Sequence, residues 1–248
     1  MSKTDIIYGL NPVVEAIKAG KEIEKIFLLK SMLPHKAAEI KKVAIEFKIP
    51  IQYVPKEKLN RFTRQNHQGI VAITSPVFYT NIETLLPTLF ESGKAPFILI
   101  LDKITDVRNL GAIARSAKCA GVDAIVIPAH GSAMINADAV KTSAGALNKI
   151  PVCRNSNLKE TILYLKNSGL QIVAATEKAK NYYYDINYNK PLALILGSEE
   201  KGVSDEYLKL CDNTVKIPMI GEIQSLNVSV AGGIIMFEVV KQRMLITD

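Results

Sequence analysis

The chain beyond residue 96 is built from short apolar runs that alternate with stretches of helical spacing. Residues 97–101 and 192–196 are apolar at every position. A strand has this composition when both faces of its sheet are covered, because a strand with one wet face alternates apolar and polar residues. Helices between such strands supply the covering layers. The sequence therefore predicts a parallel α/β sheet with strands at residues 97–101, 124–127, 150–153, 170–175, 192–196 and 215–217, and helices at residues 110–120 and 138–147.

A smaller α/β module precedes this sheet. Its pattern predicts a helix that ends near Gly20, a second helix within residues 37–47, and strands at residues 24–29, 50–54 and 69–73. Residues 74–76, Thr-Ser-Pro, then break the periodicity. We therefore predict a first domain at residues 1–75, a linker at residues 76–81 and a second domain at residues 82–248.

Charge is unevenly distributed along the chain, whose net charge at pH 7 is +7. Residues 1–75 hold 13 Lys and Arg against 7 Asp and Glu, whereas the remaining 18 and 17 almost cancel. A basic module beside a nearly neutral one is typical of a polyanion-binding appendage on a catalytic domain. A lysine-rich surface that only keeps the protein in solution explains the charge equally well.

Composition limits the classes of protein that remain. With 248 residues, 48% of them hydrophobic, and no long polar tract, the chain should fold throughout. Its start lacks the pattern of a signal peptide, and its three cysteines are dispersed, which predicts a reduced, cytoplasmic protein. The apolar run at residues 228–240 is interrupted by Glu238 and is too short to span a bilayer. Three dispersed histidines predict no metal site.

Three polar loops follow predicted strands. Asp102, Gly197 and Pro218 each come directly after a strand. The carboxyl ends of parallel strands lie at one edge of a sheet, and open α/β sheets bind their ligands beyond that edge. We therefore expect the three loops to meet in one site. The last loop contains Ser225 and leads into an apolar helix, whose first N–H groups are free to hold a polar ligand.

These loops lie in stretches that resemble the signature motifs of the SpoU, or TrmH, family of RNA ribose 2′-O-methyltransferases. The stretches are residues 102–117, 196–203 and 217–231, in the order and at the spacing of the family. Nearer the start, residues 7–17 and 67–72 resemble the substrate-binding domain of the branch that methylates large-subunit ribosomal RNA. The resemblance covers most of the chain.

The resemblance implies a fold and a reaction. The fold is a small, ribosomal-protein-like α/β substrate-binding domain followed by a trefoil-knotted methyltransferase domain of the SPOUT type with a parallel sheet. The implied cofactor is S-adenosylmethionine, cradled by the loops at Gly197 and Ile217. The implied partners are 23S ribosomal RNA, in which a guanosine ribose is methylated, and a second subunit that completes the site in a homodimer. No membrane or metal is expected.

The motifs also imply two sets of site residues. The catalytic set is Asn109, Arg115, Glu199, Ser225 and Asn227, and the cofactor-binding set is Leu196, Gly197, Ile217, Met219 and Leu226. In the family, the arginine that matches Arg115 is essential and has been proposed to activate the 2′-hydroxyl. A guanidinium with a pKa of roughly 12.5–13.8 rarely gives up its proton. We therefore expect Arg115 to grip the target phosphate and to stabilise the developing alkoxide.

Each catalytic candidate also has a structural interpretation. Asn109 is a candidate N-cap for the helix that carries Arg115, and Arg115 could cap a helix or pair with Asp106. Glu199 could pair with Arg115, bind a ribose hydroxyl, or be a solvated loop charge. Ser225 and Asn227 could contact the reacting ribose or hold the loops through bonds to the backbone.

Some positions do not follow the family pattern. Val107 stands where the family usually has proline, and Glu200 stands where it usually has glycine. The first change loosens a turn, and the second alters the φ preference of the loop. The tyrosines at residues 182–184 are expected to pack or to form an interface, although they could also stack on RNA bases.

Two other functions remain open at this point. One is the same reaction on the ribose of a transfer RNA. The other is a non-catalytic RNA-binding factor in ribosome assembly that keeps the fold, which the retention of all five catalytic candidates disfavours. A nicotinamide-dependent enzyme is disfavoured further, because the chain has no G-x-G-x-x-G fingerprint.

Overall fold

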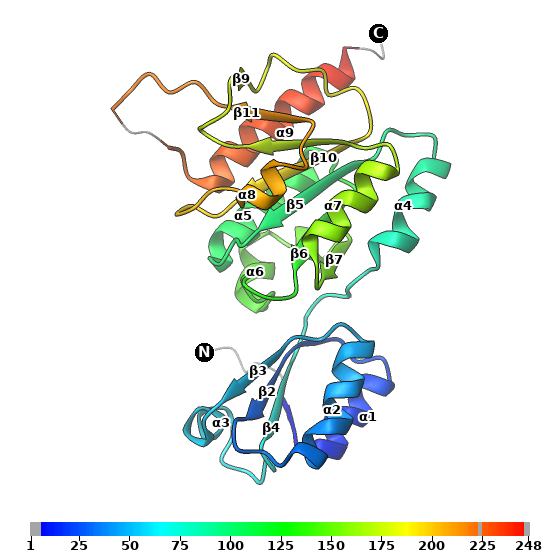
Figure 1. Ribbon diagram of the computed structural model, residues 1–248, viewed down its shortest axis with the longest axis vertical. Coiled ribbons are helices and arrows are strands. Elements are labelled where there is room, and N and C mark those ends of the chain that lie inside the picture. Colours follow the sequence, from blue (N-terminus) through cyan, green and yellow to red (C-terminus); the bar gives the residue numbers. More distant parts are fainter. Residues whose placement is uncertain (1–5, 223–224, 246–248) are drawn as a thin grey trace. The chain divides into compact units, whose positions relative to one another are not determined.

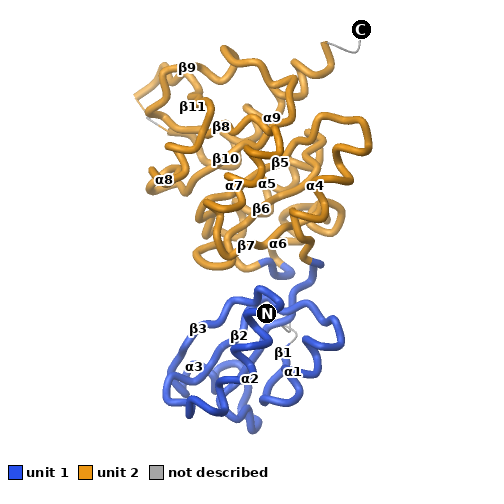
Figure 2. The backbone as a smooth tube through the Cα atoms, turned by 45° about the vertical axis from the view of Figure 1, so that its right-hand side comes forward, with its two compact units in different colours: residues 1–78, 135–137 blue, residues 79–134, 138–248 orange. Residues whose placement is uncertain are grey.

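The computed structural model describes residues 6–222 and 225–245 (Figure 1). The chain divides into two compact units (Figure 2). The first unit comprises the described residues up to Phe78 together with Ile135–Ala137, and the second comprises the other described residues from Tyr79 onward. The linker at residues 76–81 and the domain bounds on either side of it stay predictions.

The first unit is a four-stranded sheet with three helices. Its strands are β1 (Ile6–Tyr8), β2 (Ile23–Leu29), β3 (Ile51–Val54) and β4 (Ile70–Thr74), and its helices are α1 (Leu10–Lys18), α2 (Pro34–Glu46) and α3 (Lys56–Phe62). The strand order is β1-β4-β2-β3, with β4 antiparallel to β1 and β2, and β3 parallel to β2. A core that includes Val13, Ile26 and Ile40 joins helices to sheet. The predicted α/β module is present, although the sequence pattern did not indicate β1 or α3.

The second unit is a seven-stranded sheet in the order β7-β6-β5-β10-β8-β11-β9, with parallel pairing throughout. The prediction of a parallel sheet is confirmed. Its strands are β5 (Phe97–Asp102), β6 (Ala124–Pro128), β7 (Val152–Asn155), β8 (Gln171–Ala175), β9 (Asn181–Tyr182), β10 (Leu192–Gly197) and β11 (Asn213–Lys216). Its helices are α4 (Ile82–Glu91), α5 (Val107–Cys119), α6 (Ala137–Thr142), the 3-10 turn η1 (Ala146–Asn148), α7 (Leu158–Asn167), α8 (Asp205–Leu208) and α9 (Val228–Met244).

Both faces of this sheet are covered, as the apolar strands require. Ile98 and Ile195 lie in a buried cluster with residues of α4 and α7, such as Leu86 and Ile162. On the opposite face α9 packs against α5 and approaches β10, where a Cβ on Gly232 would lie 2.6 Å from the Leu196 side chain. The continuous apolar strands are therefore buried between two helical layers (Figure 1).

Strands β5 and β10 pair side by side although about ninety residues of chain separate them. The register runs from Leu192 opposite Phe97 to Gly197 opposite Asp102. This register places the starts of two predicted motifs, at Asp102 and Leu196, at the same edge of the sheet. The trefoil knot that the resemblance implies stays a prediction, since residues 223–224, in the loop before α9, lie outside the described residues.

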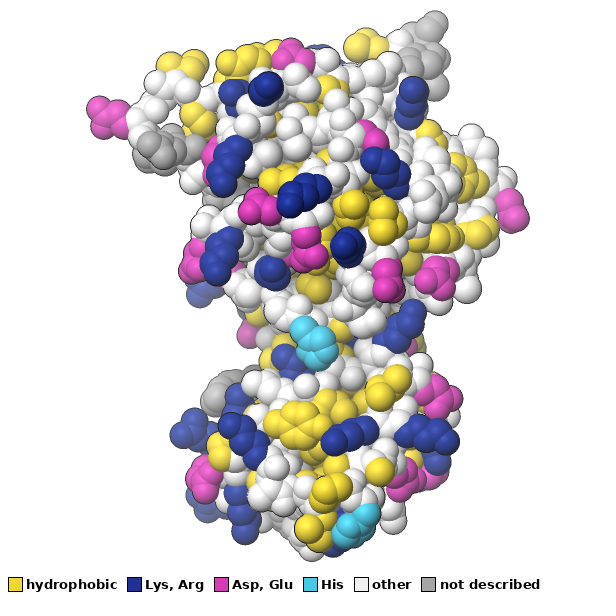
Figure 3. All heavy atoms as spheres, viewed as in Figure 1, with side chains coloured by type: hydrophobic (Ala, Val, Ile, Leu, Met, Phe, Trp, Pro, Cys, Tyr) yellow, Lys and Arg dark blue, Asp and Glu magenta, His cyan; other side chains and the backbone are white. Residues whose placement is uncertain are grey.

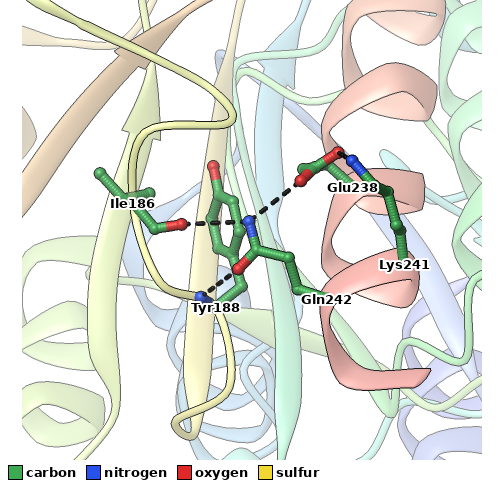
Figure 4. A network of polar contacts seen from close by, with 5 residues as sticks. All are labelled: Ile186, Tyr188, Glu238, Lys241 and Gln242. Carbon is green, nitrogen blue, oxygen red and sulfur yellow. Dashed lines mark hydrogen bonds and ion pairs between the residues drawn. The ribbon is translucent and has the colours of Figure 1, made fainter. Parts of the chain in front are cut away.

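The end of α9 is tied to the segment at residues 183–191 by side-chain to backbone bonds (Figure 4). Gln242 donates to the carbonyl of Ile186 at 3.1 Å and accepts from the amide of Tyr188 at 3.0 Å. Arg243 donates to the carbonyls of Tyr188, Lys190 and Ala95. These bonds fix a segment that has little regular structure, and they hold it beside the sheet.

Two predicted helices have different bounds in the structure. The helix expected at residues 110–120 begins at Val107, because the side chain of Asp106 accepts the Arg108 amide at 2.6 Å and caps it. The helix expected at residues 138–147 is split into α6 and η1. Ala144 and Gly145, with φ of 50° and 81°, interrupt it, since a helix cannot pass through the left-handed region.

Within residues 6–222 and 225–245, no helix combines the length and the apolar character that a membrane span needs. The same residues contain no group of three or more His, Cys, Asp or Glu side chains arranged to hold a metal ion.

The three cysteines differ in their environment, and we expect them to differ in reactivity. Burial raises the pKa of the Cys153 thiol to about 12. Burial, with a smaller effect of the Asp212 carboxylate, likewise raises the pKa of Cys211 to about 12, whereas Cys119 is exposed.

Because the thiolate is the nucleophile, a disulfide reagent at pH 8 should label Cys119 fast and should label Cys153 and Cys211 only after unfolding. Mass spectrometry of the labelled protein checks this, and native labelling of Cys153 at the rate of Cys119 would contradict it.

Candidate active site

A cavity of about 320 Å³ lies at the carboxyl edge of the second unit's sheet. Four segments form its wall: the end of β8, the loop after β10, the loop after β11, and the approach to α9 with its first two turns. The lining residues are 175–177, 196–200, 202, 215–217, 219, 225, 226, 228, 231 and 235. All five residues predicted to bind the cofactor line this cavity, namely Leu196, Gly197, Ile217, Met219 and Leu226. Their role as ligands stays a prediction.

Gly197 allows the loop after β10 to fold back on itself. Ser198 and Gly202 form an isolated bridge in which the Gly202 amide donates to the Ser198 carbonyl at 2.8 Å. A Cβ on Gly197 would lie 2.0 Å from the carbonyl carbon of Gly202, a distance that real structures do not show. Gly202 itself has a φ of 65°, which favours glycine. Gly197 is therefore required by the close approach of the Gly202 backbone, whereas Gly202 is favoured by its positive φ.

Asp102 anchors the far end of the same loop. Its side chain is buried at the end of β5, opposite Gly197 in the register, and its Oδ2 accepts the Ser204 amide at 2.8 Å. Lys103 also donates to the Ser204 hydroxyl, at 3.1 Å. The loop is thus held at both ends by residues that terminate adjacent strands.

Three of the predicted catalytic side chains form one polar cluster. Glu199 Oε1 accepts from Asn109 Nδ2 at 2.5 Å and from Asn227 Nδ2 at 2.8 Å. Asn227 Nδ2 also donates to Asn109 Oδ1 at 3.1 Å. The three residues come from α5, the loop after β10 and the start of α9. The structure therefore joins side chains from all three motifs around Glu199, which lines the cavity.

The helix caps differ from the structural interpretations that the sequence allowed. Asn109 lies in the first turn of α5 and is not its N-cap, because Asp106 fills that position. Its side chain is therefore free to bind Glu199. The N-cap of α9 is Asn227, whose Oδ1 accepts the Ser229 amide at 2.9 Å. Ser225 precedes this cap in an exposed stretch and lines the cavity.

Arg115 is the predicted catalytic residue that neither lines the cavity nor joins the polar cluster. It lies in the middle of α5, is exposed, and is not among the residues that line the cavity. No described residue gives it a hydrogen bond or an ion pair, so neither Asp106 nor Glu199 is its partner here. Its guanidinium is available for a group outside the described residues of this chain.

Some lining residues were not predicted. Thr176 and Glu177 follow β8, and Lys216 ends β11. The strand-end argument that selected Asp102 and Gly197 applies equally to β8, which was expected at residues 170–175. The signal for Thr176 and Glu177 was therefore present in the sequence.

Glu200, which stands where the family usually has glycine, has no cost in backbone geometry, because it is not among the residues with positive φ.

The similarity of the chain to known proteins shows its family. The family model described as SpoU rRNA Methylase matches residues 96–237, which is more than half of the chain. The chain belongs to the SpoU family. A second model, described as RNA 2′-O ribose methyltransferase substrate binding, matches residues 6–80. The SpoU, or TrmH, family comprises RNA 2′-O-methyltransferases that use S-adenosylmethionine. The predicted family, α/β fold class and cofactor are confirmed.

Relatives of the SpoU family are similar over most of their length. YacO of Bacillus subtilis, named for the TrmH family of tRNA/rRNA methyltransferases, is 36% identical over 239 residues, 96% of each chain. The crystal structure of the SpoU methyltransferase AviRb from Streptomyces viridochromogenes in complex with AdoMet has a TM-score of 0.62 at 21% identity, covering 97% of this chain and 90% of that one. The TrmH/SpoU tRNA modifying enzyme of A. aeolicus has a TM-score of 0.57 at 32% identity, covering 67% and 86%.

The close approach at Gly197 predicts the effect of adding a single methyl group there. Gly197→Ala should force the loop at residues 198–203 outward, since its Cβ would meet the backbone of Gly202. Overpacking of this kind costs about 1–3 kcal/mol. We expect the affinity for S-adenosylmethionine to fall at least tenfold, measured by titration calorimetry, while the circular dichroism spectrum stays native.

Gly221→Ala is the matched control. Gly221 lies in the next loop, a Cβ there would meet nothing within 4 Å, and its φ does not favour glycine. This variant should bind the cofactor as the unmodified protein does. If both variants bound it normally, the loop geometry at Gly197 would not matter for the site.

Proposed function

We propose that this SpoU family member methylates the ribose 2′-hydroxyl of a guanosine in 23S ribosomal RNA, as a cytoplasmic enzyme. The observation that carries the proposal is the polar cluster of Asn109, Glu199 and Asn227 beside the cavity. The choice of 23S RNA is supported by residues 7–17 and 67–72, which resemble the domain of the branch that acts on that RNA. The choice of guanosine as the methylated nucleoside is supported by the same resemblance.

The cavity suits a cofactor that combines a flat base with a positive charge. Leu196, Ile217 and Leu226 offer apolar side chains, and Gly197 lets the backbone approach a ligand closely. The carboxylates of residues 177, 199 and 200 line the cavity with a single lysine, Lys216, so the local field favours a cation. When bound, S-adenosylmethionine supplies an electrophilic methyl group.

Glu199 is placed to orient the ribose. Its Oε1 takes both amide hydrogen bonds of the cluster, and its Oε2 accepts none from the described residues. A carboxylate accepts hydrogen bonds only, so Oε2 suits a hydroxyl donor such as that of a ribose. Because Asn109 and Asn227 fix the carboxylate, little entropy is lost when the ribose binds.

We assign to Arg115 the target phosphate and the charge that develops on the 2′-oxygen. The guanidinium is exposed and has no partner among the described residues. A planar cation with five donors can hold a phosphate in a fixed orientation, and it stabilises an alkoxide without losing its own proton. The separation of Arg115 from the lining of the cavity supports a site completed by a second subunit.

Helix α9 supports the homodimer. One side of it is buried in the unit, through Val228, Ile235 and Val239. The exposed fractions of Val230, Phe237 and Met244 are 49%, 50% and 65%. A helix with apolar residues on both sides is typical of one that packs on its own domain with one side and on a second protein surface with the other. Since α9 packs on α5, which carries Arg115, an interface on this helix would bring Arg115 near a second copy.

The first unit supports a role in RNA docking. In Figure 3, Lys and Arg side chains gather along the side of this unit that carries β3 and α3. Lys58 Nζ lies 5.5 Å from the ring centre of Phe27, and Lys41 Nζ lies 5.6 Å from that of Tyr53, which is 46% exposed. Clustered cations bind phosphates without reading sequence.

Transfer of labelled methyl from S-adenosylmethionine tests the function. We expect label in large-subunit ribosomal RNA and, after nuclease mapping, one 2′-O-methylguanosine. Transfer RNA is the parallel substrate, since relatives carry both RNA classes in their names. Label in transfer RNA alone would keep the reaction and overturn the substrate. Cofactor binding without label in naked RNA or in assembly intermediates would favour the non-catalytic factor.

A complementation experiment tests Arg115 and the dimer together. We expect Arg115→Ala and Glu199→Gln each to lower kcat by about 10²–10³-fold, because each removes stabilisation of the transition state. Arg115→Ala should leave the affinity for the cofactor unchanged. In mixed dimers purified with two tags, one of the two sites regains both side chains, so activity should return to about half of the unmodified level.

The control for this experiment is Lys118→Ala, which removes an exposed cation from the last turn of the same helix and should leave activity intact. Inactive mixed dimers would place Arg115 in the site of its own chain. A monomer in light scattering would overturn the dimer itself.

A further inference from the structure

Three consecutive tyrosines stand at the outer edge of the second unit's sheet. Tyr182 ends β9, the last strand in the sheet order, and Tyr183 and Tyr184 follow it. The rings of Tyr182 and Tyr184 are stacked, with centres 5.5 Å apart and an angle of 21°. The ring of Tyr183 meets Tyr184 edge-on, with centres 5.0 Å apart. We call Tyr182, Tyr184 and the neighbouring Lys216 the aromatic edge.

A short turn holds these rings in place. The Tyr182 amide donates to the Asp185 carboxylate at 2.8 Å, and the Asp185 amide donates to the Tyr182 carbonyl at 3.0 Å. Residues farther along are fixed to α9 through Gln242 (Figure 4). The side chains therefore project from a backbone that is already ordered, which lowers the entropy that a ligand must remove.

Lys216 joins the aromatic edge to the cavity. It pairs with Tyr182 in the register of β11 and β9, and its carbonyl accepts the Tyr183 amide at 2.9 Å. Its Nζ lies 5.3 Å from the centre of the Tyr182 ring, and the same residue lines the cavity. The aromatic edge therefore begins at the cavity that Glu199 also lines, and it continues onto β9, the strand next to β11.

Exposure distinguishes these rings from packing residues. Tyr182 is 37% exposed and Tyr184 is 47% exposed, whereas Tyr188, a few residues farther along, is fully buried. Two nearby lysines, Lys178 and Lys180, are exposed as well. Hydrophobic and basic side chains lie together at the surface over β9 in Figure 3, viewed as in Figure 1. Aromatic rings with adjacent cations form a surface suited to nucleic acid.

We propose that the aromatic edge stacks an unpaired nucleobase of the substrate RNA close to the methylated nucleotide. The inference rests on the proposed function and adds a specific contact to it. Every base has a π-face, so stacking on tyrosine tolerates sequence, and Lys216, Lys178 and Lys180 can neutralise the phosphates on either side. Bases in a helical duplex are stacked on one another, so the edge selects single-stranded segments, loops or bulges.

Tyr182→Leu and Tyr184→Leu remove the stacking face and keep an apolar side chain. We expect each to raise the KM for RNA about tenfold, consistent with the energy of one stacked base, with kcat and the affinity for S-adenosylmethionine unchanged. Tyr184→Phe keeps the ring and should retain the KM of the unmodified protein. Phe90→Leu is the matched control, since Phe90 is a 38% exposed ring on α4.

Binding provides a second readout that does not depend on catalysis. The affinity for a fluorescent single-stranded oligoribonucleotide should fall by a similar factor in the two leucine variants and not in Tyr184→Phe. If the unmodified protein methylates no RNA, the proposed function fails, and this binding comparison still decides on stacking. Leucine variants with unchanged KM and affinity would overturn the inference. So would leucine variants that dissociate in light scattering, which would make the edge a contact between copies.

Discussion

The pairing of β5 with β10 is the constraint on which the site depends. Because Gly197 lies opposite Asp102, the loop after β10 starts beside the buried carboxylate that holds its far end at Ser204. The loop can close over this short distance only if Gly197 has no side chain, since the backbone of Gly202 occupies the space of a Cβ. The wall of the cavity is therefore a consequence of strand order and of one missing methyl group.

Glu199 links this loop to the rest of the site. An exposed carboxylate in water would turn freely, but two asparagine amides hold Glu199 from α5 and from the start of α9. Asn227 has a second task, because its Oδ1 caps α9 through the Ser229 amide. A single side chain thus fixes both the beginning of the helix that covers the sheet and the orientation of the proposed ribose acceptor.

Several features of the site were evident in the sequence, and the errors have physical causes. Leu196, Gly197, Ile217, Met219 and Leu226, which the motif resemblance implied as cofactor ligands, all line one cavity. Their loops meet there because the carboxyl ends of parallel strands share an edge, and their role as ligands stays a prediction. The assignment of Asn109 as a helix cap was wrong. Asp106 caps α5 three residues earlier, and a cap is decided by whichever oxygen reaches the first free amides, which periodicity does not reveal.

The sequence by itself determined the sheet, its burial and the identity of the motifs, since continuous apolar strands and motif spacing are local properties of the chain. The strand ends also predicted that the three loops meet, but only the tertiary structure decided which side chains touch. Asn109, Glu199 and Asn227 meet because β10 lies beside β5 and α9 packs on α5. Tyr182 lies beside Lys216 because β9 pairs with β11. Contacts between residues so far apart depend on strand order, which no local pattern encodes, because the same apolar strands fit several orders equally well.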